Sequence, residues 1–569
     1  MNRRKFIALS TVSTCTFSMT RFSSKTLQSD PGKIPGWLVE LIKTNDKGLE
    51  SLLGYQITDQ TDINFGGVKD YQDILNPHST AAIIQAGACS LFSDSSEFYN
   101  SARVIDALAA AAGYLVKTQH SDGTIDLLST NFHSTPDTGF LVKRLSNSYS
   151  LLSKANPPGV EKILVPLKKF LQKGGEALIS GGIHTPNHRW VVSAALTKLN
   201  GLWPDPRYVE RAEQWLGEHL DIDADGQFNE KSTFIYSPLT DRLLITIAKG
   251  LNKPEIFDAV RKNLSMTMFY MHPNGEIVTE ASGRQDKAIV GTLENYYYPY
   301  RYMALKDGNG EFAAMCKRIE ETAGQKIRGS LDYLLDDHTL WRPLPASKAL
   351  PVSYAKPFPN SGLVRIRRNN WDSTIIAKNA VWLTYMNGSA VLQGIRFASS
   401  FFGKGQFKSE KINEEGNRWV LTQKLEGPYY QPYPKASISP DGDWEKMPRE
   451  NRPQSEIQVL ETTVTIREMD KGLEIEISSK GTDRVPVAIE LIFRQGGVLA
   501  GVVKADPDKD QWLLKEGTGT YTSGSDTITF GPGTALHKNI ALRGSLPAMD
   551  APTVYLTGFT PFQHTLKIS

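Results

Sequence analysis

Asn187 and His188 stand side by side at the expected start of a helix, where both side chains could act on an anion. They follow Thr185-Pro186 and lead into the apolar run 191–199. Thr185 suits the N-cap and Pro186 the first helical position, which leaves the next two residues in the first turn. The free N–H groups and the helix dipole there favour negative charge and lower the pKa of a histidine. The pair therefore suits the stabilisation of a carboxylate or enolate-like anion by a neutral His188. Alternatively, Asn187 only caps the helix and His188 packs at the surface.

A second polar group is the loop 225–236, Asp-Gly-Gln-Phe-Asn-Glu-Lys-Ser-Thr-Phe-Ile-Tyr, which enters a helix expected to begin near Ser237. Polar residues alternate with aromatic ones in this loop. A third group, 131–140, places His133 and Asp137 among hydroxyl groups ahead of another helix. Each group also has a purely structural interpretation, as an Asp-Gly turn with a capping serine or as a capped turn with a surface histidine.

A fourth group combines charges with aromatic rings over 279–286 and 296–301. Its arginines could each hold a carboxylate, bidentately where the geometry allows. Its tyrosines are typical of walls that stack on sugars and also of ordinary helix cores. The residues of the four groups that we expect to touch a substrate or act on it are His133, Asp137, Asn187, His188, Arg189, Trp190, Glu230, Tyr236, Glu280, Arg284, Gln285, Tyr297, Tyr300 and Arg301.

The elements that must position these groups are helices joined in hairpins. Apolar residues recur at three- and four-residue spacing in successive stretches. Glycine-bearing turns at Gly123, Gly182, Gly226 and Gly275 follow one another about every 50 residues, enough for two helices and two loops. Such hairpins form an open solenoid or close into a toroid, and the four polar groups all fall in loops at one phase of the repeat. This favours a toroid with a cleft at one end. The expected helices cover 104–116, 160–171, 190–199, 208–220, 239–251 and 311–322.

Beyond the helices the pattern switches to strict alternation of apolar and polar residues, as in 459–466 and 473–477. A run of helices followed by a run of antiparallel strands predicts separate α and β domains. The fold class is therefore a multidomain α-then-β chain. Its expected parts are an incomplete α/α-toroid at 29–341, a proline-rich linker at 342–361 and an antiparallel β-sandwich at 362–569.

One stretch of the expected sandwich, 427–434, is rich in proline and tyrosine. Proline removes a donor from the hydrogen-bond ladder, so this stretch is a poor central strand. We expect it to lean over the toroid mouth and to stack on sugar through Tyr430. A loop packed on its own domain is the alternative.

Residues 1–28 are similar to a twin-arginine export signal, with Arg3 and Arg4 ahead of a short apolar stretch. An ordinary secretory signal is the alternative, and Cys15 is a weaker indication of a lipid anchor. The segment holds five basic residues and no acidic one, so the formal charge of +3 for the whole chain is about −2 without it. The pI of 8.4 therefore indicates no affinity for nucleic acid. No apolar run is long enough to span a membrane, and we expect export to the periplasm of a Gram-negative bacterium.

At these residues the chain resembles the heparinase II/III-like and alginate-lyase group of α/α-toroid polysaccharide lyases, which includes a rhamnose–glucuronate type acting on arabinogalactan. The group carries an Asn-His pair at a helix start and, some tens of residues later, an Asp-Gly-Ser-x-x-Glu-x-Ser-x-x-Tyr loop. Asn187-His188 matches the pair. The loop is matched, except for Gln227 at its first serine and one extra residue before the tyrosine, by Asp225, Gly226, Glu230, Ser232 and Tyr236.

The resemblance implies cleavage of the 4-O-linkage to a uronic acid by β-elimination, which leaves a 4,5-unsaturated uronate. Asn187, with Arg189 or Arg284, would bind the uronate carboxylate. His188 would remove the C5 proton and Tyr236 would protonate the leaving oxygen, although one tyrosine does both in some members. The scheme requires no cofactor and no metal, while a structural divalent cation stays open.

Two other classes of protein stay open. A toroid glycoside hydrolase needs two carboxylates across the scissile bond, which Glu230 with Glu280 or Asp137 could supply. A non-catalytic glycan-binding protein needs neither. The expected partner is an acidic polysaccharide or oligosaccharide. Heparinoids, alginate, glucuronan and the rhamnose–glucuronate caps of arabinogalactan are all compatible. The lack of basic runs and the frequent tyrosines near the site argue against heavily sulfated glycans, and we expect glucuronate in a plant-type glycan, such as rhamnose-capped arabinogalactan. Cys89 and Cys316 stand in apolar settings without zinc-ligand spacing and are expected to be buried free thiols.

Overall fold

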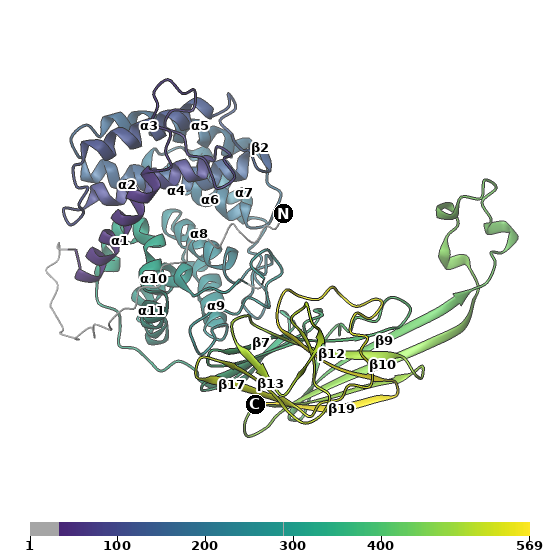
Figure 1. Ribbon diagram of the computed structural model, residues 1–569. Helices are drawn as coiled ribbons and strands as arrows, with labels where there is room; N and C mark the ends of the chain where they lie inside the picture. Colours follow the sequence, from purple (N-terminus) through teal and green to yellow (C-terminus); the bar gives the residue numbers. More distant parts are fainter. Residues whose placement is uncertain (1–33, 288) are drawn as a thin grey trace. The chain divides into compact units, whose positions relative to one another are not determined.

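The computed structural model describes residues 34–287 and 289–569, and these form two compact units. The predicted export segment, 1–28, lies outside the described residues. Helices come first and strands follow, as the sequence pattern predicts (Figure 1). The two units are a helical unit, which runs to Met268 and resumes over Ser282–Leu350, and a β unit, which consists of Phe269–Ala281 and Pro351–Ser569.

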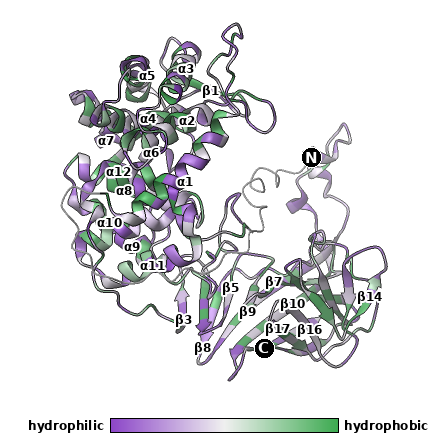
Figure 2. Cartoon of the chain, turned by 60° about the vertical axis from the view of Figure 1, so that its left-hand side comes forward, coloured by the Kyte–Doolittle hydropathy of each residue, from purple (hydrophilic) through white to green (hydrophobic). Residues whose placement is uncertain are grey.

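The helical unit consists of amphipathic helices joined by short turns, and every stretch predicted to be helical lies largely within one of them. Figure 2 shows that its helices carry both hydrophobic and hydrophilic residues. The α-helices are α1 Gly36–Leu53, α2 Pro77–Phe92, α3 Ala102–Thr118, α4 Thr135–Ala155, α5 Glu161–Ser180, α6 His188–Leu202, α7 Pro206–Leu216, α8 Tyr236–Gly250, α9 Phe257–Thr267, α10 Tyr297–Asp307, α11 Gly310–Ala323 and α12 Leu331–Asp336. Short 3₁₀ turns are η3 Pro254–Ile256, η4 Glu294–Tyr296, η5 Gly324–Ser330 and η6 His338–Trp341, and a small hairpin joins β1 Ile125–Leu127 to β2 Asn131–Ser134.

Alternate helices α2, α4, α6 and α8 pack side by side and run in the same direction. At their N-terminal ends, His78 of α2 contacts Asp137 of α4, and the ring of Phe140 on α4 contacts that of His188 on α6. Toward the opposite end, residues from the C-terminal halves of α4, α6 and α8 line one cavity of about 360 Å³. The intervening helices α3, α5 and α7 pack against them. The helix starts are therefore gathered at one end, which is the toroid arrangement that the repeat predicts.

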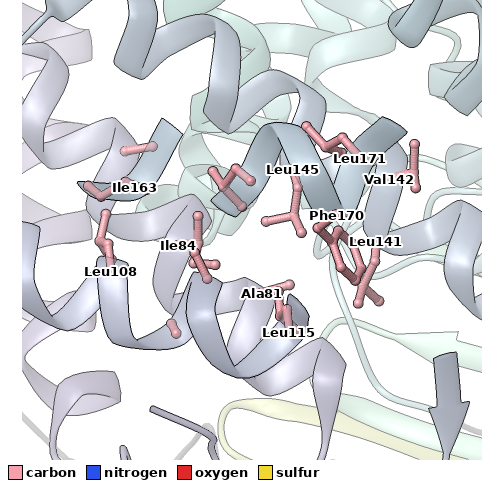
Figure 3. Close-up of a cluster of buried hydrophobic side chains, with 14 of the residues drawn as sticks. Ala81, Ile84, Leu108, Leu115, Leu141, Val142, Leu145, Ile163, Phe170 and Leu171 are labelled. Atoms are coloured by element: carbon pink, nitrogen blue, oxygen red, sulfur yellow. The ribbon is translucent and has the colours of Figure 1, made fainter. Parts of the chain in front are cut away.

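Apolar side chains from four successive helices hold this arrangement together. Figure 3 shows Ile84 of α2, Leu108 of α3, Leu145 of α4 and Phe170 of α5 in one buried cluster. Truncating one such side chain to alanine typically costs about 2–5 kcal/mol, because burial is lost and a cavity is left. Among the described helices none is both long and apolar enough to cross a bilayer.

The β unit contains two sheets of eight and nine strands, whose apolar faces supply one buried core. Neighbouring strands are antiparallel except for β15 and β18, which pair in parallel. The eight-stranded sheet has the order β13 Val498–Ala500, β16 Gly519–Ser523, β17 Asp526–Gly531, β19 Phe562–Ile568, β11 Leu473–Gly481, β10 Gln454–Glu468, β9 Arg418–Tyr430 and β8 Ile412–Glu415. The nine-stranded sheet has the order β14 Val503–Asp506, β15 Gln511–Leu513, β18 Thr553–Phe559, β12 Pro486–Phe493, β7 Ala390–Ser399, β6 Leu383–Asn387, β5 Trp371–Ile376, β4 Leu363–Arg368 and β3 Ser353–Phe358.

The proline-rich stretch 342–361, predicted to be a linker, includes the regular strand β3. This strand pairs with β4 at the edge of the nine-stranded sheet. An edge strand tolerates Pro357 because one side of its backbone has no strand to bond. The division between the units falls between Leu350 and Pro351, inside the predicted linker, and the part of the stretch that follows belongs to the β unit.

The segment 269–281 lies among helices in the sequence but belongs to the β unit, which differs from the predicted boundary at 341. His272 Nδ1 lies 2.8 Å from the Asp372 carboxylate, and Glu280 Oε1 accepts hydrogen bonds from Thr374 and Thr384 at 2.8 and 3.0 Å. Each of these partners lies about a hundred residues away along the chain. A local sequence pattern cannot reveal such partners.

Candidate active site

Asn187 provides a buried amide donor that no described residue satisfies. Helix α6 begins at His188 rather than at Pro186, so Asn187 occupies the cap position and makes no side-chain capping bond. Its Oδ1 instead accepts a hydrogen bond from Thr185 Oγ1 at 2.8 Å. That bond turns the amide so that Nδ2 stays buried without a partner. A buried donor of this kind is costly unless a ligand or water completes it.

His188 follows directly, partly exposed and surrounded by other rings. Phe140 and His184 contact its ring edge-on, with centroids 6.0 and 4.7 Å away. Burial, the neighbouring His184 and the charge of Arg284 lower the pKa of His188 to about 4, although Asp137 opposes the shift. His188 is therefore neutral near pH 7 and able to accept a proton.

Tyr236, at the start of α8, meets Arg284 and Gln285. Gln285 Nε2 donates to the Tyr236 hydroxyl at 2.7 Å, and the Arg284 guanidinium lies 5.4 Å from the centroid of the Tyr236 ring. Arg284 Nε also lies 3.4 Å from the buried carboxylate of Glu230. Arg284 also lies near enough to His188 for its charge to help lower the pKa of that histidine. The structure thus brings Asn187, His188, Tyr236 and Arg284 into one neighbourhood.

Asp137 lies at the same end of the unit but is occupied by its own neighbours. Its carboxylate accepts hydrogen bonds from Ser134 Oγ at 2.6 Å and Asn131 Nδ2 at 2.8 Å, and it lies 3.2 Å from His78 Nε2. Burial alone would raise the pKa of Asp137, but His78 and these hydrogen bonds outweigh burial and hold it at about 2. Asp137 is therefore a charged group that orients His78 and the start of α4.

Two predicted residues next to His188 point into the protein. Trp190 is fully buried and donates from Nε1 to Asp221 at 2.8 Å. The Arg189 guanidinium contacts Asp221 at 3.2 Å and Glu218 at 3.3 Å and bonds the Pro186 carbonyl. These contacts fix the approach to α6 and leave Arg284 as the freer arginine.

The tyrosines and arginine predicted on 296–301 are also buried. The Tyr300 hydroxyl donates to the Leu264 carbonyl at 2.7 Å, and that of Tyr297 donates to Glu320 at 2.7 Å. Arg301 donates to the Leu340 carbonyl and lies over the ring of Trp37. These three residues contribute to the helical core in place of the predicted sugar contact.

Three other predicted contacts lie in different settings. His133 is exposed on β2, where it stacks on His120 at 3.8 Å and pairs with Asp122. Glu280 is half-buried within the β unit, where Thr374 and Thr384 donate to its carboxylate. Tyr430 ends β9, with the guanidinium of Arg449 4.5 Å from its ring centroid, and its contact with sugar stays a prediction.

Sequence reasoning missed His78, Phe140 and His184 in this neighbourhood. A pattern that could have revealed the first of them is Asn76-Pro77-His78, because it repeats the combination of asparagine, proline and histidine found at the start of α6. Asn76 caps α2 by accepting from the backbone N–H groups of its first turn. The other two residues have no comparable local pattern.

Comparison with known proteins supports the fold, while the residues of the candidate site are argued from their geometry alone. No protein-family model and no curated protein matches the chain. A solved structure of the chondroitin AC lyase of Streptomyces coelicolor A3, a mutant form, aligns with a TM-score of 0.53 and 10% identity over 95% of this chain and 78% of that chain. A mutant of the heparan sulfate lyase HepC of Pedobacter heparinus aligns with a TM-score of 0.49 and 11% identity over 96% of this chain and 84% of that one. The first likeness shows a shared fold of an α/α-toroid followed by a β-sandwich.

Proposed function

We propose that this protein is a polysaccharide lyase that cleaves the 4-O-linkage to a uronic acid by β-elimination. The observation that carries the proposal is the unpartnered buried amide of Asn187 beside a neutral His188, at the same end of the unit as Tyr236 and Arg284. The chondroitin lyase fold found for this chain is consistent with that chemistry.

The first requirement of the reaction is to stabilise negative charge on the uronate as its C5 proton leaves. Asn187 Nδ2 would donate to the carboxylate, whose charge grows as the enolate-like intermediate forms. The exposed Arg284 would add a positive charge beside it. Donors set in place before the reaction usually contribute more to catalysis than any other single effect, and removing one costs about 10²–10³ in kcat.

The second requirement is a base and an acid. His188 takes the C5 proton, the C5–H electron pair forms the C4–C5 double bond, and the C4–O4 bond breaks. Tyr236 gives its proton to O4. Because the Tyr236 hydroxyl accepts a hydrogen bond from Gln285, its own hydrogen is free to be donated, and the same bond stabilises the phenolate that remains. This favours Tyr236 as the acid and His188 as the base.

A glycoside hydrolase is disfavoured by the state of its candidate acids. Hydrolysis requires one protonated carboxyl group and one ionised one. Asp137 has a pKa of about 2, and the pKa of Glu280 is also lowered, burial being outweighed by His272 and Arg365. Both are therefore ionised at neutral pH, and Glu230 is paired with Arg284.

For the substrate we propose glucuronate in a plant-type glycan, such as rhamnose-capped arabinogalactan. Support comes from the local charges: Arg284 is the one arginine of the predicted set that the described contacts leave exposed. One carboxylate per sugar suits one arginine, whereas a heavily sulfated chain would need more cations.

The test is incubation of the purified chain with a panel of uronate glycans while ultraviolet absorbance is followed. A lyase yields an unsaturated, absorbing product, and the His188→Ala variant should lose about 10²–10⁴ of the rate. Release of saturated reducing ends without absorbance would instead identify a hydrolase. Binding without any product would identify a glycan-binding protein.

A further inference from the structure

Asp286 is a fully buried carboxylate that links the two loops bearing the candidate catalytic groups. Its Oδ2 accepts hydrogen bonds from Ser232 Oγ at 2.9 Å, from the Phe234 backbone N–H at 3.0 Å and from Ser282 Oγ at 3.3 Å. Two of these donors belong to the loop before α8 and one to the loop that carries Arg284. A single oxygen therefore joins segments some fifty residues apart.

The bonds continue from Asp286 to the start of α8. Ser232 Oγ, which donates to Asp286, also accepts from the Tyr236 backbone N–H at 3.0 Å. Asp286 thus holds Tyr236 through one intervening side chain. The two residues that precede Asp286 in the chain, Arg284 and Gln285, contact the ring and the hydroxyl of Tyr236, respectively.

Other contacts tie the same two loops without reaching Tyr236. The Gly283 backbone N–H donates to the Lys231 carbonyl at 2.7 Å, and Ser282 Oγ bonds the Thr233 backbone N–H at 3.1 Å. A side chain on Gly291 would place its Cβ 2.5 Å from the Phe234 ring, so the loops also pack closely there. These contacts would keep the loops together if Asp286 were lost, but they would not set the position of Tyr236.

We propose that Asp286 is a positioning residue that holds Tyr236 against Arg284 and Gln285, so that acid and guanidinium reach the same sugar. The inference rests on the proposed lyase function. Asp286 itself is too deeply buried to contact a substrate. Its role rests on the three hydrogen bonds that Oδ2 accepts, whereas Oδ1 has no hydrogen-bond partner among the described residues.

The test is kinetic and compares Asp286→Ala with Asp286→Asn in the full chain. Asp286→Ala should lower kcat about 10²-fold, because a displacement of about 1 Å at a reacting group costs that much. Its KM should change little, since the amide of Asn187 is not part of this network. Asp286→Asn keeps an acceptor oxygen toward the loops and should retain most of kcat.

A matched control is Asp46→Ala. Asp46 is a buried carboxylate that also accepts two serine hydroxyls and one backbone N–H, from Ser90, Ser96 and Glu97. Losing it removes the same number and kind of bonds at a site remote in sequence from the candidate active site. Asp46→Ala should lower the melting temperature as Asp286→Ala does, but it should leave kcat unchanged.

Hydrogen–deuterium exchange provides a measurement that needs no substrate. In Asp286→Ala the amides of 232–236 should exchange faster, while in Asp286→Asn they should stay protected. Full kcat in Asp286→Ala, or an equal loss of kcat in Asp46→Ala, would overturn the proposal. So would an Asp286→Asn variant as slow as Asp286→Ala, because charge would then matter. If the wild-type chain makes no unsaturated product, the lyase proposal fails. Hydrogen–deuterium exchange then still tests whether Asp286 holds the loop 232–236 in place.

Discussion

Asn187 and His188 have different partners although they are neighbours in the chain. The Asn187 side chain is oriented by Thr185 and leaves its donor free, whereas rings surround His188 and keep it neutral. A donor without a partner and a base without a charge suit a site that binds a carboxylate and then removes a neighbouring proton.

Replacing Asn187 by alanine should lower kcat/KM about 10²–10³-fold, because a donor set in place for the developing charge is lost. The melting temperature should fall only slightly, since the side chain loses one hydrogen bond, from the partly exposed Thr185, and the amide nitrogen has no protein partner to lose. Steady-state kinetics and calorimetry on the same sample measure both. Thr185→Val is a useful companion, because it keeps the amide but removes its orienting bond, and it should give a smaller loss.

The pH dependence of kcat/KM should reflect the pKa of His188, which is lowered to about 4. A base with a lowered pKa stays neutral as the pH falls, so activity should persist well below 6.5 and decline only near pH 4. His184→Asn removes one of the causes of the shift and should move the acidic limb upward. An acidic limb near 6.5 in the wild type would contradict this assignment of the base.

At the scale of elements, the N-terminal ends of helices α2, α4, α6 and α8 carry the residues of the candidate site. Each end presents the positive pole of a helix dipole, which favours a bound anion, and α6 in addition has no side chain capping its first N–H groups. The polar side chains of the candidate site stand at those ends, in the last residues of the loops and the first turns of the helices. The candidate catalytic side chains of this unit therefore lie at helix starts and not along helix faces.

Asp137 stabilises one of these helix starts, and its contribution should depend on pH. Its pKa is lowered from 3.8 to about 2, so the stabilisation is present above pH 3.8 and is lost as the pH falls toward 2. Asp137→Ala should therefore cost about 1–3 kcal/mol of stability at pH 7, because it leaves the donors of Ser134 and Asn131 without their acceptor. Urea denaturation at several pH values tests this. The two proteins should converge at the acidic end, and a constant difference would show that Asp137 acts without its charge.

At the scale of the whole molecule, the β unit takes a segment from the middle of the helical sequence and binds it through buried charges. Burial alone would lower the pKa of His272, but Asp372 and Glu280 outweigh it and raise it to about 9. Arg365 pairs with the same Asp372. The segment runs on directly into Ser282 and Arg284, so chain connectivity relates this cluster to the candidate site.

His272→Ala should destabilise the β unit by about 3–5 kcal/mol, because it leaves buried carboxylates with one cation fewer. In the wild type this contribution is fully present below pH 6.5 and is lost as the pH rises through 9, since His272 then loses its proton in the folded state. Scanning calorimetry of the full chain at pH 6 and above pH 9 measures both effects. Equal melting of variant and wild type at pH 6 would show that the cluster contributes nothing to stability.

The sequence by itself predicted that helices come first and strands follow, and it placed the start of α6 to within about two residues. Apolar spacing predicts the helices and alternation predicts the strands, because both depend on which neighbours along the chain share a buried face. The Asn187-His188 pair and the loop ending at Tyr236 were recognisable for the same reason, since the residues that matter lie within one turn or loop.

The tertiary structure decided which polar residues meet. Tyr297, Tyr300 and Arg301 resemble a sugar-binding wall in sequence, yet they lie in the helical core with their polar atoms bonded. Glu280 pairs within the β unit, and His78 joins the site from a helix start more than a hundred residues before His188. A side chain's exposure depends on partners distant along the chain, and only folding brings those partners together.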